Sequence, residues 1–172
     1  MILFHGTSPN KGKKIINDGF IRVSSSENSH HHGLTGLEMT TYGYVYLTSS
    51  ESKALQYGLA AAASEGKSAA YIFEVNINVD KLVTDNDECD IQRISECRPL
   101  ECIPCNAQNC INAIESVRYP ANLHVGKEVT RYQVIRVSLE NRKKKQSLQQ
   151  GWTSLSEDAA SLFIKIFKGL FL

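Results

Sequence analysis

Two tyrosines eleven positions apart frame the stretch of this sequence that is best suited to hold a flat ring. Tyr46 lies in a β-branched and aromatic run that is typical of a strand, and Tyr57 lies in the helix that we expect after it. Residues 48–50 supply hydroxyl groups for a helix N-cap, and Glu51 places a carboxylate at the positive end of the helix dipole. A strand that turns directly into a helix gives one aromatic wall on each arm, and a slot with such walls suits a planar ring.

The elements that must position this corner are short. Apolar runs and alternation predict strands at residues 2–4, 20–23, 45–47, 69–78, 123–125 and 129–139. Capping signals predict helices at residues 11–18 and 50–63, while residues 111–117 are compatible with either a strand or a helix. Residues 24–41 are polar and aperiodic, which predicts a long loop, and long loops in compact domains are usually functional. We therefore expect an α+β fold.

The composition is that of one globular domain. The chain has 172 residues, of which 42% are hydrophobic and 22% charged, and its net charge of +1 gives no electrostatic reason to expect nucleic acid as a partner. We expect neither a signal peptide nor a transmembrane span. The five cysteines are an odd number and cluster between Cys89 and Cys110, which indicates a reducing compartment. The expected location is the cytoplasm, or a host cytosol into which the protein is delivered.

The tyrosine stretch resembles the second signature of the ADP-ribosyltransferase superfamily, in the branch of diphtheria toxin and the poly(ADP-ribose) polymerases. That signature has a glycine, an aliphatic residue and a strand-end tyrosine, then a polar turn and Ser-Lys-Ser-Ala-x-Tyr. Here residues 43–46 read GYVY and residues 52–57 read SKALQY, and the spacing between the tyrosines matches without a gap. The sequence departs from the pattern at Ala54, where the family has the serine that contacts the nicotinamide amide.

The first signature of the same family, His-Gly-Ser/Thr at the end of the first strand, is similar to His5, Gly6 and Thr7. The resemblance implies that His5 binds the adenosine-side ribose of NAD. It also implies that the Gly6 backbone pairs with the nicotinamide carboxamide, because a residue without Cβ lets a ring approach the main chain. Without the resemblance, the same tripeptide is a strand-end histidine followed by a turn.

The third signature is an acid just before the last strand, followed by an aromatic and an aliphatic run. Glu128 and the residues after it, VTRYQVI, resemble it, which makes Glu128 the expected catalytic carboxylate. The plain alternative is a turn residue paired with Lys127 or Arg131. Glu115 is the competing acid, on an element whose type the sequence leaves open.

The resemblance implies a split β-sandwich with an NAD cleft between two small sheets. Cleavage of the nicotinamide bond builds positive charge on the ribose, and a carboxylate fixed in a water-poor site stabilises that charge. Tyr46 and Tyr57 would sandwich the nicotinamide ring, and residues 24–41 would cover the substrate. The implied catalytic residues are His5, Tyr46 and Glu128, and the implied NAD-binding residues are His5, Gly6, Thr7, Tyr46, Lys53 and Tyr57.

The implied activity is NAD-dependent mono-ADP-ribosylation of a macromolecule, with a protein as the expected acceptor and nucleic acid still open. Many arginine-modifying relatives carry a second acid or Gln two residues before the catalytic glutamate, and Gly126 stands at that place here. Two alternatives remain: an NAD glycohydrolase that uses water as the acceptor, and a catalytically inactive binding module. An RNA 2′-phosphotransferase would need arginines around a phosphate, and no arginine precedes His5.

The cysteines form an insertion at residues 84–110 with the ligand set Cys97, Cys102, Cys105 and Cys110, and with Cys89 upstream. Thiolates at such spacings can hold zinc, and three of them match an iron–sulfur spacing. Neither pattern is complete in its surroundings, which favours free thiols or one local disulfide over a metal site. The histidines at residues 30–32 are expected to belong to the loop, because three adjacent positions cannot all face one ion.

We expect two regions. Residues 1–140 would form the ADP-ribosyltransferase-like domain, and residues 141–172 would form a basic linker and a C-terminal amphipathic helix. The wide apolar face of that helix predicts packing on the domain or a contact between subunits. The alternative is an anionic membrane surface, which the basic linker would favour.

Overall fold

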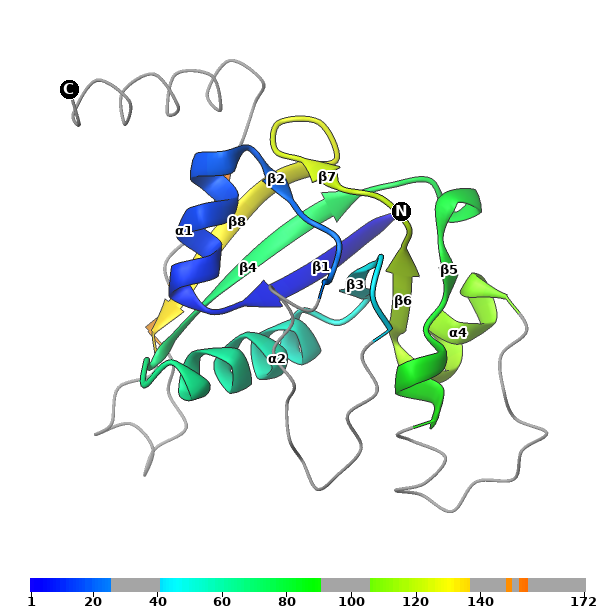
Figure 1. The fold of residues 1–172 in the computed structure, drawn as a ribbon, viewed down its shortest axis with the longest axis horizontal. Coiled ribbons are helices and arrows are strands. Elements are labelled where there is room, and N and C mark those ends of the chain that lie inside the picture. The colour runs from blue at the N-terminus through cyan, green and yellow to red at the C-terminus, as the bar shows by residue number, and fades with distance from the viewer. Residues whose placement is uncertain (26–40, 91–105, 137–147, 150–151, 155–172) are drawn as a thin grey trace.

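The computed structural model describes residues 1–25, 41–90, 106–136, 148–149 and 152–154. One antiparallel sheet has the strand order β10-β8-β4-β1-β3-β6-β5, with β9 also paired to β8 (Figure 1). Its strands are β1 (Ile2–Thr7), β3 (Val45–Thr48), β4 (Ala69–Asn76), β5 (Val83–Thr84), β6 (Ser116–Tyr119), β8 (Val129–Arg136), β9 (Leu148–Gln149) and β10 (Thr153–Ser154). A separate pair joins β2 (Phe20–Ile21) to β7 (Leu123–His124).

Helices lie on both faces of the sheet. They are α1 (Pro9–Asp18), α2 (Glu51–Ser64), α4 (Ala107–Ile114) and the 3-10 helix η1 (Val79–Lys81), and a further helix begins at Asn86. The larger apolar cluster lies on the face that α1 covers, with Leu3, Ile15 and Phe73 among its members. The smaller cluster lies between the sheet and α2, around Ala54 and Ile72.

Local signals in the sequence explain both long helices. The Ser8 side chain accepts the backbone N–H of Lys11 at the start of α1, and Ser50 accepts that of Lys53 at the start of α2. Gly19 ends α1 at a positive φ of 83°, a conformation that glycine adopts without steric cost. The predicted helices at residues 11–18 and 50–63 are therefore confirmed. The ambiguous stretch 111–117 contains the end of α4 and then the start of β6.

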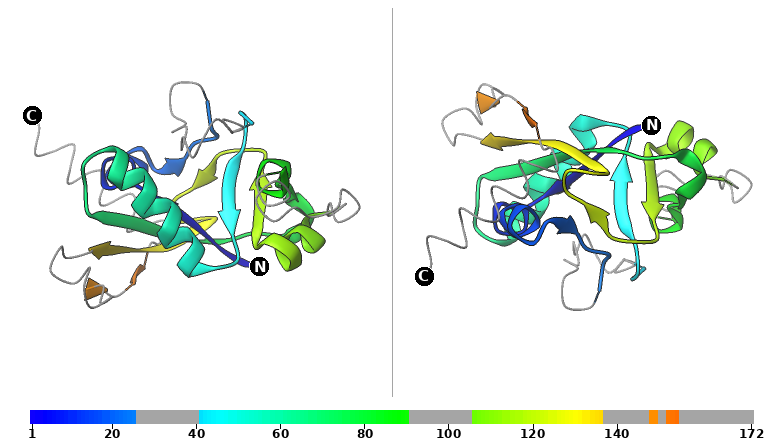
Figure 2. Two further views of the ribbon diagram at one scale, coloured as in Figure 1. Left: turned by 90° about the horizontal axis from the view of Figure 1, so that it is seen from below. Right: turned by 90° about the horizontal axis from the view of Figure 1, so that it is seen from above.

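The sheet consists of two well-paired parts that meet at a narrow seam. β1 pairs with β4 from Ile2 to Thr7, and β3 pairs with β6 along its whole length. Between β1 and β3, by contrast, the only paired position in the described residues is Phe4 with Thr48. Beyond that position the two strands diverge (Figure 2). Gly6 and Tyr46 are therefore not joined by a backbone ladder, although their strands are neighbours.

The end of the described chain extends the sheet. β9 and β10 both pair with β8, so part of the region expected to be a linker contributes strands. The Trp152 ring packs 6.0 Å from the Phe4 ring, and the Arg131 guanidinium lies 4.8 Å from the same indole. The expected C-terminal helix lies outside the described residues, as do the histidines 30–32 and the cysteines Cys97, Cys102 and Cys105. No helix in the described part of the chain is long and apolar enough to cross a membrane.

Candidate functional site

His5 lies at the seam between β1 and β3 and links the two parts of the sheet. Its Nδ1 is 3.0 Å from the carbonyl oxygen of Tyr46. Burial lowers the pKa of His5; the hydrogen bond to Tyr46 opposes this shift, and the charge of Lys11 adds to it. The ring is therefore neutral near pH 7, and because a carbonyl can only accept, Nδ1 carries the proton. Nε2 is then an acceptor, suited to the hydroxyl group of a ligand such as a sugar.

Tyr46 projects from β3 toward the acidic segment, residues 85–90. Its hydroxyl lies 2.5 Å from Asp87 Oδ2 and 2.7 Å from the carbonyl oxygen of Thr41. Burial and the Asp87 carboxylate raise the pKa of Tyr46, so the phenol keeps its proton at physiological pH. Asp87 also accepts the backbone N–H and the hydroxyl of Thr41, both at 2.7 Å.

Tyr57 and Lys53 lie one turn apart on α2 and share a single partner. The Tyr57 hydroxyl donates to Glu88 Oε2 at 2.8 Å, and the Lys53 ammonium donates to Glu88 Oε1 at 2.8 Å. Lys53 also donates to the carbonyl oxygen of Ile114 at 2.7 Å. Burial, and then the charge of Glu88, raise the pKa of Tyr57. One carboxylate thus fixes two side chains of the expected binding site.

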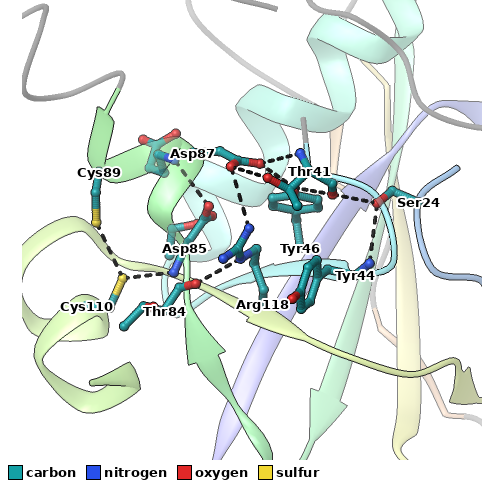
Figure 3. Close-up of polar contacts among 12 residues, drawn as sticks. Ser24, Thr41, Tyr44, Tyr46, Thr84, Asp85, Asp87, Cys89, Cys110 and Arg118 are labelled. Atoms are coloured by element: carbon teal, nitrogen blue, oxygen red, sulfur yellow. Dashed lines mark hydrogen bonds and ion pairs between the residues drawn. The ribbon is translucent and has the colours of Figure 1, made fainter. Parts of the chain in front are cut away.

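Arg118 completes the network from β6 (Figure 3). It forms an ion pair with Asp87 at 3.5 Å, donates from Nε to the Thr84 carbonyl oxygen at 2.8 Å, and stacks on the Tyr44 ring at 4.4 Å. Both charged side chains are almost fully buried, at 7% exposure for Arg118 and 11% for Asp87. Sequence analysis did not single out Arg118, Asp87 or Glu88. The dense run of acids DNDECD at residues 85–90 was the available signal.

Asp85 anchors the base of the acidic segment. It accepts the Ser116 hydroxyl at 2.5 Å and the backbone N–H of Glu88 at 3.2 Å. Burial raises the pKa of Asp85, while the hydrogen bond from Ser116 opposes that shift. Its own N–H points to Cys110 Sγ at 3.3 Å. The segment is therefore tied to β6 and to α4.

Gly6 and Thr7 lie in the contact between β1 and α2. A Cβ at Gly6 would lie 1.7 Å from the carbonyl oxygen of Ala54, so the helix backbone rests directly on this glycine. Thr7 is buried at 5% exposure, beside Gly58 of the same helix. Helix packing alone explains why position 6 is a glycine. Ala54, where the family has its second serine, is fully buried in this contact.

Glu128 does not lie with the other expected site residues. It precedes β8, which β4 and β1 separate from β3. Its Oε2 accepts the backbone N–H of His124 at 3.0 Å, and its Oε1 is 3.3 Å from the Lys127 ammonium. Partial burial acts to raise the pKa of Glu128, but these two partners outweigh it and leave the pKa below its ordinary value. This geometry is that of a turn residue paired with Lys127.

Glu115, the competing acid, lies at the strand–helix corner itself. It follows α4, directly precedes β6, and its carbonyl oxygen accepts the N–H of Ser49 at 3.1 Å. Its φ of 55° is uncommon for a residue other than glycine, and the hydrogen bond from its own N–H to Ile111 helps to hold it. The side chain is exposed. Of the two acids, Glu115 is the one that directly precedes the strand paired with β3.

Two of the five cysteines, Cys89 and Cys110, lie within the described residues, and they face each other. Cys110, expected to join Cys97, Cys102 and Cys105, lies with its Sγ 3.9 Å from that of Cys89, and both thiols are free and buried. Within the described residues, no group of three or more His, Cys, Asp or Glu side chains is placed to hold a metal ion.

Comparisons with known proteins give a likeness of fold. No family model and no curated protein matches the sequence. A solved structure named EcPltA is similar, with a TM-score of 0.52, 11% sequence identity, and coverage of 89% of this chain and 84% of that chain. At this identity, the similarity supports the mixed α+β architecture with its antiparallel sheet.

Proposed function

We propose that the chain is an NAD-dependent mono-ADP-ribosyltransferase that cleaves the nicotinamide bond of NAD and transfers ADP-ribose to a protein. The observation that carries the proposal is the contact between His5 and the Tyr46 backbone, at 3.0 Å across the seam. Two sequence segments that separately resemble signatures of this family meet there, although 41 positions separate them. A chance match of either short motif would not require the two to meet.

The residues at the seam suit the two ends of NAD. The neutral His5 ring has an acceptor nitrogen for a ribose hydroxyl. Tyr46 and Tyr57 are protonated phenols on separate arms, and such rings stack well on a planar nicotinamide. Because their hydroxyls are already held by carboxylates, the rings lose little freedom when a ligand binds.

We propose Glu115, in place of Glu128, as the carboxylate that stabilises the positively charged ribose. Such a group must lie close to the developing charge in a water-poor site, and because the Glu115 side chain is exposed in the free chain, bound NAD would have to exclude water from it. The backbone of Glu115 is hydrogen-bonded to Ser49 at the corner between β3 and α2. Glu128 precedes β8, which β4 and β1 separate from that corner. Glu128 also has its own partners, His124 and Lys127.

The test measures nicotinamide release from NAD by the purified chain, with and without cell lysate. The matched variants are Glu115→Gln and Glu128→Gln, which remove one charge each and keep the side-chain volume. We expect Glu115→Gln to reduce release by about a hundredfold or more, and Glu128→Gln to change it by less than about threefold. Labelled NAD should mark a protein in the lysate.

Other results would each exclude part of the proposal. Release that lysate neither raises nor directs to a protein would identify a glycohydrolase. NAD binding without release would identify an inactive binding module. A large loss in Glu128→Gln, with Glu115→Gln unaffected, would return the catalytic role to Glu128.

A further inference from the structure

Two consecutive acids reach the two arms of the proposed nicotinamide site from a third element. Asp87 lies 2.5 Å from the hydroxyl of Tyr46 on β3. Glu88 lies 2.8 Å from the hydroxyl of Tyr57 on α2. Neither acid belongs to the strand or to the helix that it contacts. The distance between the two phenols is therefore set by one dipeptide as well as by the β3–α2 turn.

The contacts are made at the tips of the rings. A tyrosine held at its hydroxyl cannot swing about its Cα–Cβ bond without breaking that hydrogen bond, and a bond at the hydroxyl does not itself cover a face of the ring. Bonds from a phenol to an ionised carboxylate are short and about twice as strong as neutral ones. The two hydrogen bonds therefore restrict the rings from their hydroxyl ends.

The dipeptide is held firmly on its other side. Asp87 is paired with Arg118 at 3.5 Å, and Glu88 with Lys53 at 2.8 Å, so each carboxylate has a cation as well as a tyrosine. Asp85 precedes the pair and is bonded to Ser116. Cys89 follows it and lies against Cys110. Anchors on both sides give the segment the rigidity that a positioning element needs.

We propose that Asp87 and Glu88 act as a positioning pair that fixes the Tyr46 and Tyr57 rings at the spacing required by the nicotinamide of NAD. The inference rests on the proposed function for the identity of the ligand. The two acids touch the tyrosine hydroxyls and not the reacting atoms, so their role is to preorganise binding. Their loss should weaken NAD binding more than it slows the chemical step.

A double-mutant cycle between Glu88 and Tyr57 tests the pair. The variants are Glu88→Ala, Tyr57→Phe and both together, with the NAD dissociation constant measured by calorimetry and KM and kcat by nicotinamide release. We expect Glu88→Ala to raise the dissociation constant and KM about three- to tenfold while kcat stays within about twofold. Tyr57→Phe should do the same. The double variant should be no worse than Glu88→Ala alone, because Glu88→Ala already removes the contact that Tyr57→Phe removes.

Two further variants separate positioning from folding and from charge. Glu88→Gln keeps an acceptor for Tyr57 and should restore affinity to within about twofold of the wild type. Asp80→Ala removes an exposed acid from η1 and should leave affinity unchanged. Effects of Glu88→Ala that simply add to those of Tyr57→Phe would overturn the proposal, as would a loss of affinity in Asp80→Ala of similar size.

Fluorine NMR tests the pair without any ligand. With 3-fluorotyrosine in place of all seven tyrosines, the Tyr57→Phe variant identifies the Tyr57 resonance by its absence. We expect Glu88→Ala to shift or broaden that resonance and to leave the other resonances nearly unchanged. An unmoved Tyr57 resonance would overturn the positioning pair itself. A wild-type chain that fails to bind NAD, with the Tyr57 shift still present, would instead overturn the proposed function and its assignment of the ligand.

Discussion

The imidazole of His5 and the backbone carbonyl of Tyr46 form a 3.0 Å hydrogen bond at the place where β1 and β3 no longer pair. The bond replaces a missing rung of the backbone ladder with a side-chain contact. It links the two halves of the sheet where, among the described residues, β1 and β3 form no backbone pair beyond Phe4. Because Nδ1 must donate, the bond also fixes which ring nitrogen can serve a ligand.

The burial of His5 predicts a stability that depends on pH. Burial lowers the pKa of His5 below its ordinary value of 6.5. When the pH falls below about 6.5, the unfolded chain takes up the proton and the folded chain resists it, so the free energy of unfolding decreases. The contribution of His5 is complete above that pH. Urea unfolding at about pH 7.5, 6.5 and 5.5 should show a steeper loss on acidification for the wild type than for His5→Gln.

The exposed His124 serves as the control for this measurement. His124→Gln removes a histidine at an exposed position away from the seam, and the slope for His5→Gln is compared with the slope for this variant. Equal slopes for the wild type and His5→Gln would contradict the lowered pKa of His5.

The strand–helix corner was predictable because its signals are local. Ser50 caps α2, Glu51 lies in its first turn, and the tyrosine spacing follows from the path of the chain through one turn. The strand at residues 69–78 was also recognised by its alternation and appears as β4. In each case the residues that determine the element are neighbours in the sequence.

The site was less predictable because it depends on which strands become neighbours. Glu128 and Glu115 both precede a strand, and the distinction between them requires knowing that β6 and not β8 pairs with β3. The contacts of Asp87 and Glu88 with the two tyrosines likewise appear only when β5 is placed beside β6. Strand order is set by packing over the whole chain, and a short motif does not contain it.

The close contact between Gly6 and α2 predicts a large loss of stability when Gly6 is replaced. An added Cβ would lie 1.7 Å from the Ala54 carbonyl oxygen, so α2 would have to move away from the sheet. Gly6→Ala should lower the free energy of unfolding by about 3 kcal/mol or more in urea denaturation. Gly66→Ala is the comparison, because a Cβ there meets nothing within 4 Å and only its φ of 65° is unfavourable. It should cost about 1 kcal/mol, and a similar loss at both positions would argue against the close contact at Gly6.

The buried thiols predict slow chemical modification. Burial raises the pKa of Cys89 to about 12 and also raises that of Cys110, so the reactive thiolate is scarce at pH 8. Mass spectrometry should find both residues largely unmodified after iodoacetamide treatment of the folded chain, and fully modified after unfolding in urea without a reductant. The second result is expected because their sulfur atoms are 3.9 Å apart, well beyond a bonded distance. Protection that survives unfolding would show that a disulfide is present.

Because Arg118 and Asp87 form a buried ion pair, removing one partner should strongly lower the free energy of unfolding. Arg118→Met keeps much of the apolar stem but leaves Asp87 buried beside Asp85 without its cation. We expect a loss of about 3–5 kcal/mol in the free energy of unfolding. Arg22→Met is the matched control, since Arg22 pairs with Asp18 at the surface and is 52% exposed, and it should cost less than about 0.5 kcal/mol. If both variants lose the same small amount, Asp87 has other sufficient partners, and the acidic segment does not depend on Arg118 for its position.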